Sequence, residues 1–172
     1  VTLTGAGTST QAMVVGNGII VEDTDTVPQV TSNTFNFSAS FSINGWYNAG
    51  APSDQVEIVR YDAAGSTKFL FYLDPNTASV IWQVRDYTAS TYFASLDQLP
   101  AADEDHFFAV YYDHDALQIY DAPGGILTVC DHRSGSTDHV AMDQLEFRRR
   151  VLTPEDVRDI MAANRAGHAY QY

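Results

Sequence analysis

Residues 35–47, FNFSASFSINGWY, alternate in polarity more regularly than any other stretch of this chain. Apolar residues, most of them aromatic, stand at the odd positions, and serine and asparagine fill the even ones, a period of two that is typical of a half-buried strand. Trp46 breaks the pattern, because it falls on the polar face. We expect either a bulge at Trp46 or a second packed layer that covers this face.

Most of the other segments also predict strands. The turn residues at 16–18, GNG, indicate a hairpin between 13–15 and 19–21. Short apolar runs separated by Asp, Pro, Asn and Gly follow about every ten residues. They predict further strands at 55–61, 68–73, 79–85, 106–112, 116–121 and 126–130. Many short strands with turns between them favour an all-β, two-sheet antiparallel β-sandwich.

One helix is predicted, near the end of the chain. Thr153 is an N-cap residue, Pro154 suits the first helical position, and two acidic residues follow in the first turn. Val157, Ile160 and Met161 then recur at spacings of three and four. We therefore expect a short C-terminal α-helix with one apolar stripe that lies on the sandwich.

The composition limits the possible partners. The chain has 172 residues, enough for one domain with a real core, and a formal net charge of −13. An acidic surface repels phosphate backbones, so nucleic-acid binding is disfavoured. No apolar run reaches the length of a membrane span, and no signal peptide is visible. Cys130 is the single cysteine, which excludes an intrachain disulfide and predicts a buried, inert thiol.

Four segments resemble the laminin-G-like, concanavalin A-like jelly-roll family in order and spacing. They are FSINGWY (41–47), FLFYLD (69–74), FFAVYYDHDALQIYD (107–121) and DQLEFRRRVLTPEDVRDIM (143–161). Residues 121–125, DAPGG, replace the shorter turn that is usual in the family. The resemblance implies one jelly-roll domain over 1–172, with its core at about 16–162 and a tail at 163–172. It also implies an extracellular module that binds glycans or proteins, acts as a spacer or, more rarely, cleaves polysaccharides.

A glycan site needs aromatic platforms with polar groups around them. The segment 81–93, IWQVRDYTASTYF, combines both kinds of side chain. The residues that we expect to contact a ligand are Trp82, Arg85, Asp86, Tyr87 and Tyr92. Trp82 has an alternative role, because a tryptophan in an alternating strand is more often part of the core.

Calcium is the metal that an Asp-rich chain suits best, since it takes hard oxygen ligands. Carboxylates one residue apart in a turn converge on one ion, which points to Asp23, Asp25, Asp113 and Asp115. The sequence therefore predicts a structural Ca²⁺ ion and no required cofactor.

Catalytic machinery is not evident. Glycosidases of this fold class place paired carboxylates on one strand, facing one groove. The pattern E-x-D-x-x-E is absent, and Asp143 and Glu146 would face opposite sides of a regular strand. No G-x-S-x-G elbow occurs either. We expect a protein that is not an enzyme.

Three classes of function remain open. The first is a binding module of lectin-like type that recognises a glycan or a protein surface. The second is a structural virion protein, a capsid decoration or tail component, because no signal peptide or disulfide is seen and the numbering begins at Val1. Tyr170 and Tyr172 in the tail would dock on this sandwich or, in a homo-oligomer or an assembled particle, on a neighbouring subunit, and a disordered tail is the alternative. The third is a polysaccharide-active enzyme. The expected location is extracellular or on the virion surface, without membrane insertion.

Overall fold

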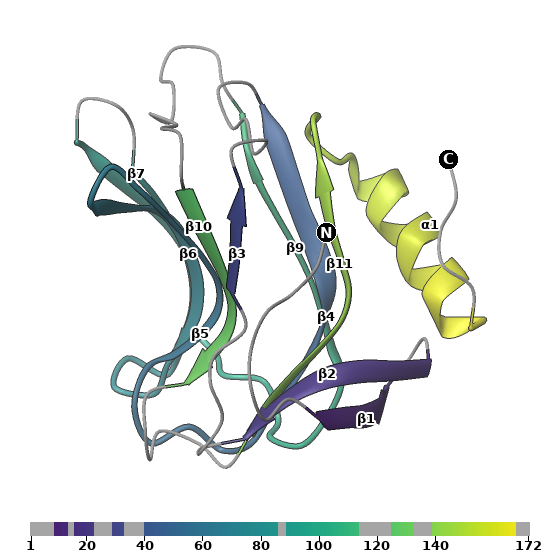
Figure 1. Ribbon diagram of the computed structural model, residues 1–172. Coiled ribbons are helices and arrows are strands. Elements are labelled where there is room, and N and C mark those ends of the chain that lie inside the picture. Colours follow the sequence, from purple (N-terminus) through teal and green to yellow (C-terminus); the bar gives the residue numbers. More distant parts are fainter. Residues whose placement is uncertain are drawn as a thin grey trace.

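Two antiparallel sheets face each other, and one helix covers the outer side of one of them (Figure 1). The computed structural model describes residues 9–13, 16–22, 29–32, 40–85, 89–113, 125–132 and 139–167. This architecture confirms the expected all-β, two-sheet antiparallel sandwich with a C-terminal helix. The finer expectation of jelly-roll connectivity stays a prediction. In the described part of the chain, no helix is long and apolar enough to cross a bilayer.

The five-stranded sheet has the order β1-β2-β11-β4-β9. Its strands are β1 (Ser9–Met13), β2 (Gly16–Glu22), β11 (His139–Arg148), β4 (Phe41–Ala49) and β9 (His106–Tyr112). The six-stranded sheet has the order β3-β10-β5-β6-β7-β8. It consists of β3 (Gln29–Ser32), β10 (Gly125–His132), β5 (Val56–Ala63), β6 (Ser66–Asp74), β7 (Ser79–Arg85) and β8 (Thr91–Leu96). Among the described strands, β9 and β8 therefore lie at sheet edges.

The predicted strands are confirmed at β5, β6, β7, β9 and β10, and the bounds of β7 and β9 are those expected. The predicted strand at 116–121 lies outside the described residues. The predicted turn at 16–18 is wrong: Gly16 pairs with Met13, so Asn17 and Gly18 belong to β2. Strand β8 was not foreseen, because TYFASL is exposed along its whole length and shows no alternation of polarity.

Strand β4 is buried on both faces, which resolves the anomaly at Trp46. The inner face packs in the core, where Phe71 and Phe108 stack across the two sheets with ring centroids 4.6 Å apart. The outer face lies under α1 (Pro154–Arg165), and Trp46 Nε1 donates a hydrogen bond to Asn164 Oδ1 over 3.0 Å. The second packed layer that Trp46 indicated is therefore the helix.

The helix begins as the sequence predicts. Thr153 Oγ1 accepts a hydrogen bond from the main-chain nitrogen of Asp156 over 3.1 Å. In return, Asp156 Oδ2 accepts one from the main-chain nitrogen of Thr153 over 2.8 Å. This reciprocal capping box satisfies two main-chain donors that the first helical turn would otherwise leave without partners.

Candidate binding site

Trp82, the expected platform, lies in the core instead. Only 8% of its surface is exposed, and its ring packs against Phe41 and Phe69. Its indole nitrogen donates a hydrogen bond to the main-chain oxygen of Tyr111 over 3.0 Å. The ring therefore cannot present a face to a ligand, and the alternative role of Trp82 as a core residue is the one that the structure supports.

The other expected ligand residues do not form one group. Arg85 ends β7, with its side chain partly exposed, and Tyr92 of β8 is 47% exposed. Tyr92 lies opposite the core residue Val84, so it faces the inner side of its sheet. Arg85 lies one residue further along and faces the outer side. Asp86 and Tyr87 lie outside the described residues.

Of the four residues expected to bind calcium, only Asp113 lies in the described part of the chain. Asp113 is exposed, and its Oδ1 accepts a hydrogen bond from Ser40 Oγ over 3.1 Å. Asp23, Asp25 and Asp115 lie outside the described part of the chain. Within that part, no three His, Cys, Asp or Glu side chains are grouped so that they could hold a metal ion. A structural Ca²⁺ ion stays a prediction.

One expectation about carboxylates is wrong. A bulge shifts the register of β11 against β4 between Asp143 and Glu146, so these residues pair with Trp46 and Asn44. Those two partners are two residues apart on β4, and both carboxylates therefore lie on the outer face of their sheet. They do not form an accessible acid–base pair. Glu146 is ion-paired with Arg148, and Asp143 is only 8% exposed.

The outer face of β7 and β8 carries an aromatic side chain among polar ones. Phe93 is 64% exposed and lies directly opposite Gln83 in the β7–β8 register. The neighbouring pairs on the same face are Arg85 with Thr91 and Ile81 with Ser95. Trp82 and Val84 face the core, so Gln83 and Arg85, which alternate with them along β7, face outward. We call the surface formed by Gln83, Arg85, Thr91, Phe93 and Ser95 the Phe93 face.

The Phe93 face has a cationic end. Arg85 forms no ion pair with any residue in the described ranges. Lys68 of β6 is close enough to Arg85 for the two charges to repel each other. Burial lowers the pKa of Lys68, and the guanidinium of Arg85 lowers it further. An anion bound near both groups would offset the repulsion between their positive charges. This end of the face therefore suits a ligand with a carboxylate.

Sequence reasoning missed Phe93 and Gln83. Phe93 lies between Tyr92 and Ala94 in a segment with no clear period, so its direction could not be read from the pattern. A signal was nevertheless present. Once Trp82 is assigned to the core, alternation along β7 turns Gln83 and Arg85 outward, and the antiparallel partner of Gln83 must share that face.

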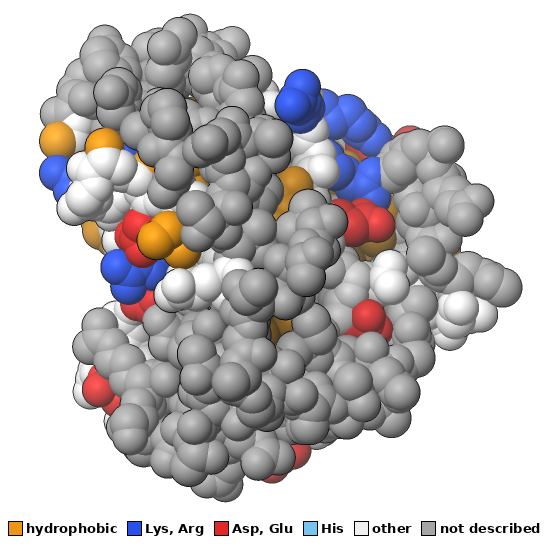
Figure 2. Space-filling view, in the orientation of Figure 1, with side chains coloured by type: hydrophobic (Ala, Val, Ile, Leu, Met, Phe, Trp, Pro, Cys, Tyr) orange, Lys and Arg blue, Asp and Glu red, His pale blue; other side chains and the backbone are white. Residues whose placement is uncertain are grey.

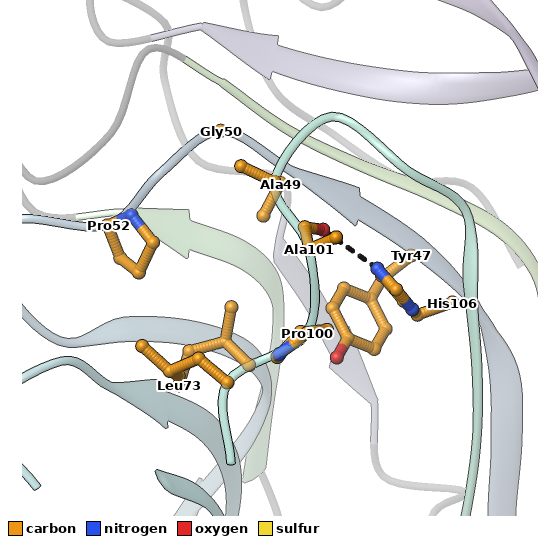
Figure 3. Close-up of a pocket in the computed structure, with 10 residues that line it drawn as sticks. Tyr47, Ala49, Gly50, Pro52, Leu73, Pro100, Ala101 and His106 are labelled. Atoms are coloured by element: carbon orange, nitrogen blue, oxygen red, sulfur yellow. Dashed lines mark hydrogen bonds between the residues drawn. The ribbon is translucent and has the colours of Figure 1, made fainter. Parts of the chain in front are cut away.

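A pocket of about 510 Å³ lies between β9 and the strands β7 and β8. Its lining is mainly apolar, with Val80 and Leu96 on one side and Phe108 and Val110 on the other. At one end lies a cavity of only about 10 Å³ beside Tyr47 (Figure 3). His106 Nε2 donates a hydrogen bond to the main-chain oxygen of Ala101 there, over 2.8 Å, as Figure 3 shows. That cavity is too small for an organic ligand.

Comparison with solved structures shows the fold. No family model and no curated protein matches the chain. The binding domain of Paraclostridial Mosquitocidal Protein 1 matches with a TM-score of 0.71 and 12% identity, over 92% of this chain and 46% of that one. The botulinum neurotoxin serotype G binding domain matches with a TM-score of 0.73 and 11% identity, over 92% and 45%. The serotype D ligand-binding domain, solved in complex with N-acetylneuraminic acid, matches with a TM-score of 0.70 and 10% identity, over 94% and 45%.

These findings correct the resemblance to the laminin-G-like, concanavalin A-like family. The solved structures named above are binding domains of a mosquitocidal protein and of botulinum neurotoxins, and no family model matches the chain. The four segments are not specific to one family, because many antiparallel sandwiches covered by a helix need alternating strands and a capped helix. The chain shares its fold with a part of these binding domains that amounts to less than half of their length.

Proposed function

We propose that this chain is a non-catalytic binding module that recognises an acidic glycan through the Phe93 face. The observation that carries the proposal is the register that places an exposed phenylalanine opposite Gln83, with Arg85 at the next outward position. Stacking on a flat ring and hydrogen bonding to polar neighbours are the two contacts by which proteins bind sugars.

The chemistry of a sialic acid fits the side chains of this face. Its carboxylate pairs with Arg85, which has no ion-pair partner in the described part of the chain. Its hydroxyl and acetamido groups find donors and acceptors in Gln83, Thr91 and Ser95. The apolar side of the sugar ring stacks on Phe93. A neutral glycan would use the same ring without the contact to Arg85.

The comparisons support a binding role in general terms. The three solved structures named above are binding domains, and one of them was solved with N-acetylneuraminic acid. The expectation that this chain is not an enzyme agrees with those names. We further propose that it acts outside the cell, as a single domain, and without membrane insertion. A role in a virion or a homo-oligomer through the tail at 163–172 stays a prediction.

An immobilised-glycan array tests the proposal. The wild-type chain should bind sialic acid-terminated glycans more strongly than their neutral counterparts, both with Ca²⁺ and with a chelator. Phe93→Ala should weaken binding about tenfold, which corresponds to roughly 1.4 kcal/mol. Tyr111→Ala is the matched control, because Tyr111 is a similarly exposed aromatic residue of the other sheet. Absence of glycan binding, or equal loss in both variants, would contradict the proposal.

A further inference from the structure

A long groove separates α1 from the outer face of β9. It measures about 720 Å³, and no Asp, Glu, Lys, Arg or His side chain is among the residues that line it. Phe107, Ala109 and Tyr111 form its floor, and Val157 and Met161 of α1 stand along its wall. Tyr111 is 56% exposed although its ring is large, and Ala109 is exposed beside it. This helix groove is an apolar surface that the described residues leave open.

The surroundings of the helix groove are basic in an acidic protein. Residues 148–165 contain five arginines and three acidic residues, in a chain with a net charge of −13. Figure 2 shows Lys and Arg side chains gathered over the upper end of β11 and the start of α1. Arg150 is ion-paired with Asp156, and Arg148 with Glu146, but Arg149 and Arg158 are exposed and form no ion pair with any described residue.

The charges on α1 are sorted by side. At about 100° per residue, Arg158 projects beside Pro154 and Met161, which line the groove. The guanidinium of Arg165 lies over the Trp46 ring, 6.0 Å from its centroid. The exposed acidic residues Glu155 and Asp159 project about 60° and 100° further round the helix than Arg158, away from the groove. The rim of the helix groove is therefore cationic while its floor is apolar. This arrangement complements a partner that presents large apolar side chains next to carboxylates.

We propose that the helix groove docks an acidic, apolar peptide segment of a partner protein. The groove is open to solvent along its floor, which leaves room for a polar peptide backbone on the outer side. A fatty acid has the same charge and an apolar chain, but acyl chains need enclosure and this floor is exposed. The site is separate from the Phe93 face, since α1 covers the five-stranded sheet and Phe93 lies on the six-stranded one.

Selection from a phage-displayed random dodecapeptide library tests this proposal. Peptides enriched on the wild-type chain should combine Leu, Phe or Trp with Asp or Glu. Their affinity, measured by fluorescence anisotropy of the synthetic peptides, should fall as NaCl is raised. Arg158→Glu and Tyr111→Ser should each weaken peptide binding about tenfold or more. Arg158→Lys keeps the positive charge and should retain most of the wild-type affinity. Both positions are exposed, so unchanged circular dichroism and thermal midpoints are expected for these variants.

Arg85→Glu is the matched control, because it makes the same change in net charge on the Phe93 face. Equal peptide affinity in Arg85→Glu and the wild type supports the helix groove, whether or not glycans bind. Loss of peptide binding in Arg85→Glu with retention in Arg158→Glu would overturn the proposal. So would the absence of enrichment, enriched peptides without carboxylates, or saturable binding of oleate where no peptide is selected.

Discussion

The indole nitrogen of Trp82 donates a hydrogen bond to the main-chain oxygen of Tyr111, 3.0 Å away, and so joins β7 of one sheet to β9 of the other. Trp82 thus has two structural roles, as a filled volume in the core and as a polar link near the edge of the sandwich. Neither role leaves the ring available to a ligand.

Trp82→Phe should keep most of the packing and remove the hydrogen bond. We expect a loss of about 1–2 kcal/mol in the free energy of unfolding, because the Tyr111 oxygen loses its donor. Trp82→Ala should cost about 3–5 kcal/mol through the cavity that it leaves. Urea unfolding followed by circular dichroism measures both. Unchanged stability in Trp82→Ala would show that the ring is not part of the core.

Asn164 should anchor α1 to the five-stranded sheet. Its Oδ1 accepts the indole hydrogen of Trp46 in a buried position. Asn164→Ala leaves that donor without its partner and should lower the free energy of unfolding by about 1–3 kcal/mol. Asn76→Ala is the control, since Asn76 is exposed in a turn. Equal unfolding midpoints for the two variants in guanidinium would contradict this anchoring role.

The helix start should become less stable in acid. A hydrogen bond from Arg150, together with those from Thr153, holds the pKa of Asp156 well below its ordinary value. A carboxyl whose pKa is depressed in the folded state stabilises the protein fully above its unfolded pKa, near 4. That stability is lost as the pH falls below about 4 toward the folded pKa. Thermal midpoints of wild type and Asp156→Asn should therefore differ at neutral pH and converge in strong acid. A constant difference down to the lowest pH would be inconsistent with this linkage.

The turn between β5 and β6 should accept a stabilising substitution. Ala63 pairs with Ser66, which leaves Ala64 and Gly65 as a two-residue loop with φ of 50° and 72°. Positive φ at both positions is typical of a type I′ turn, for which Asn-Gly is the preferred sequence. Ala64→Asn should raise the free energy of unfolding by about 0.5–1 kcal/mol, measured by urea titration. Gly65→Ala should lower it, because a Cβ is strained at that φ. Destabilisation by Ala64→Asn would mean that the turn has a different geometry.

Much of the sandwich could be predicted from the sequence alone. The period of two along 41–47 determines which of its residues share a face, and the cap at Thr153 determines where the helix starts. These are local properties, because they depend only on backbone geometry and on side chains a few residues apart. For Trp46 the sequence left two explanations open, a bulge and a second packed layer, because the alternation of one strand does not show what covers it.

Only the tertiary structure decided which face of each strand meets the core and what covers the other face. The sequence of a strand shows which side chains share a face, but not which face meets the core. Trp82 could therefore be a glycan platform or a core residue, and its contacts with Phe41 and Phe69 show that it belongs to the core. In the same way, the bulge between Asp143 and Glu146 is invisible in the sequence, yet it brings both carboxylates to one face. The Phe93 face and the helix groove both arise from contacts between distant segments. The sequence therefore determined the elements and their alternation, whereas packing between sheets and helix decided which side chains remain available to a partner.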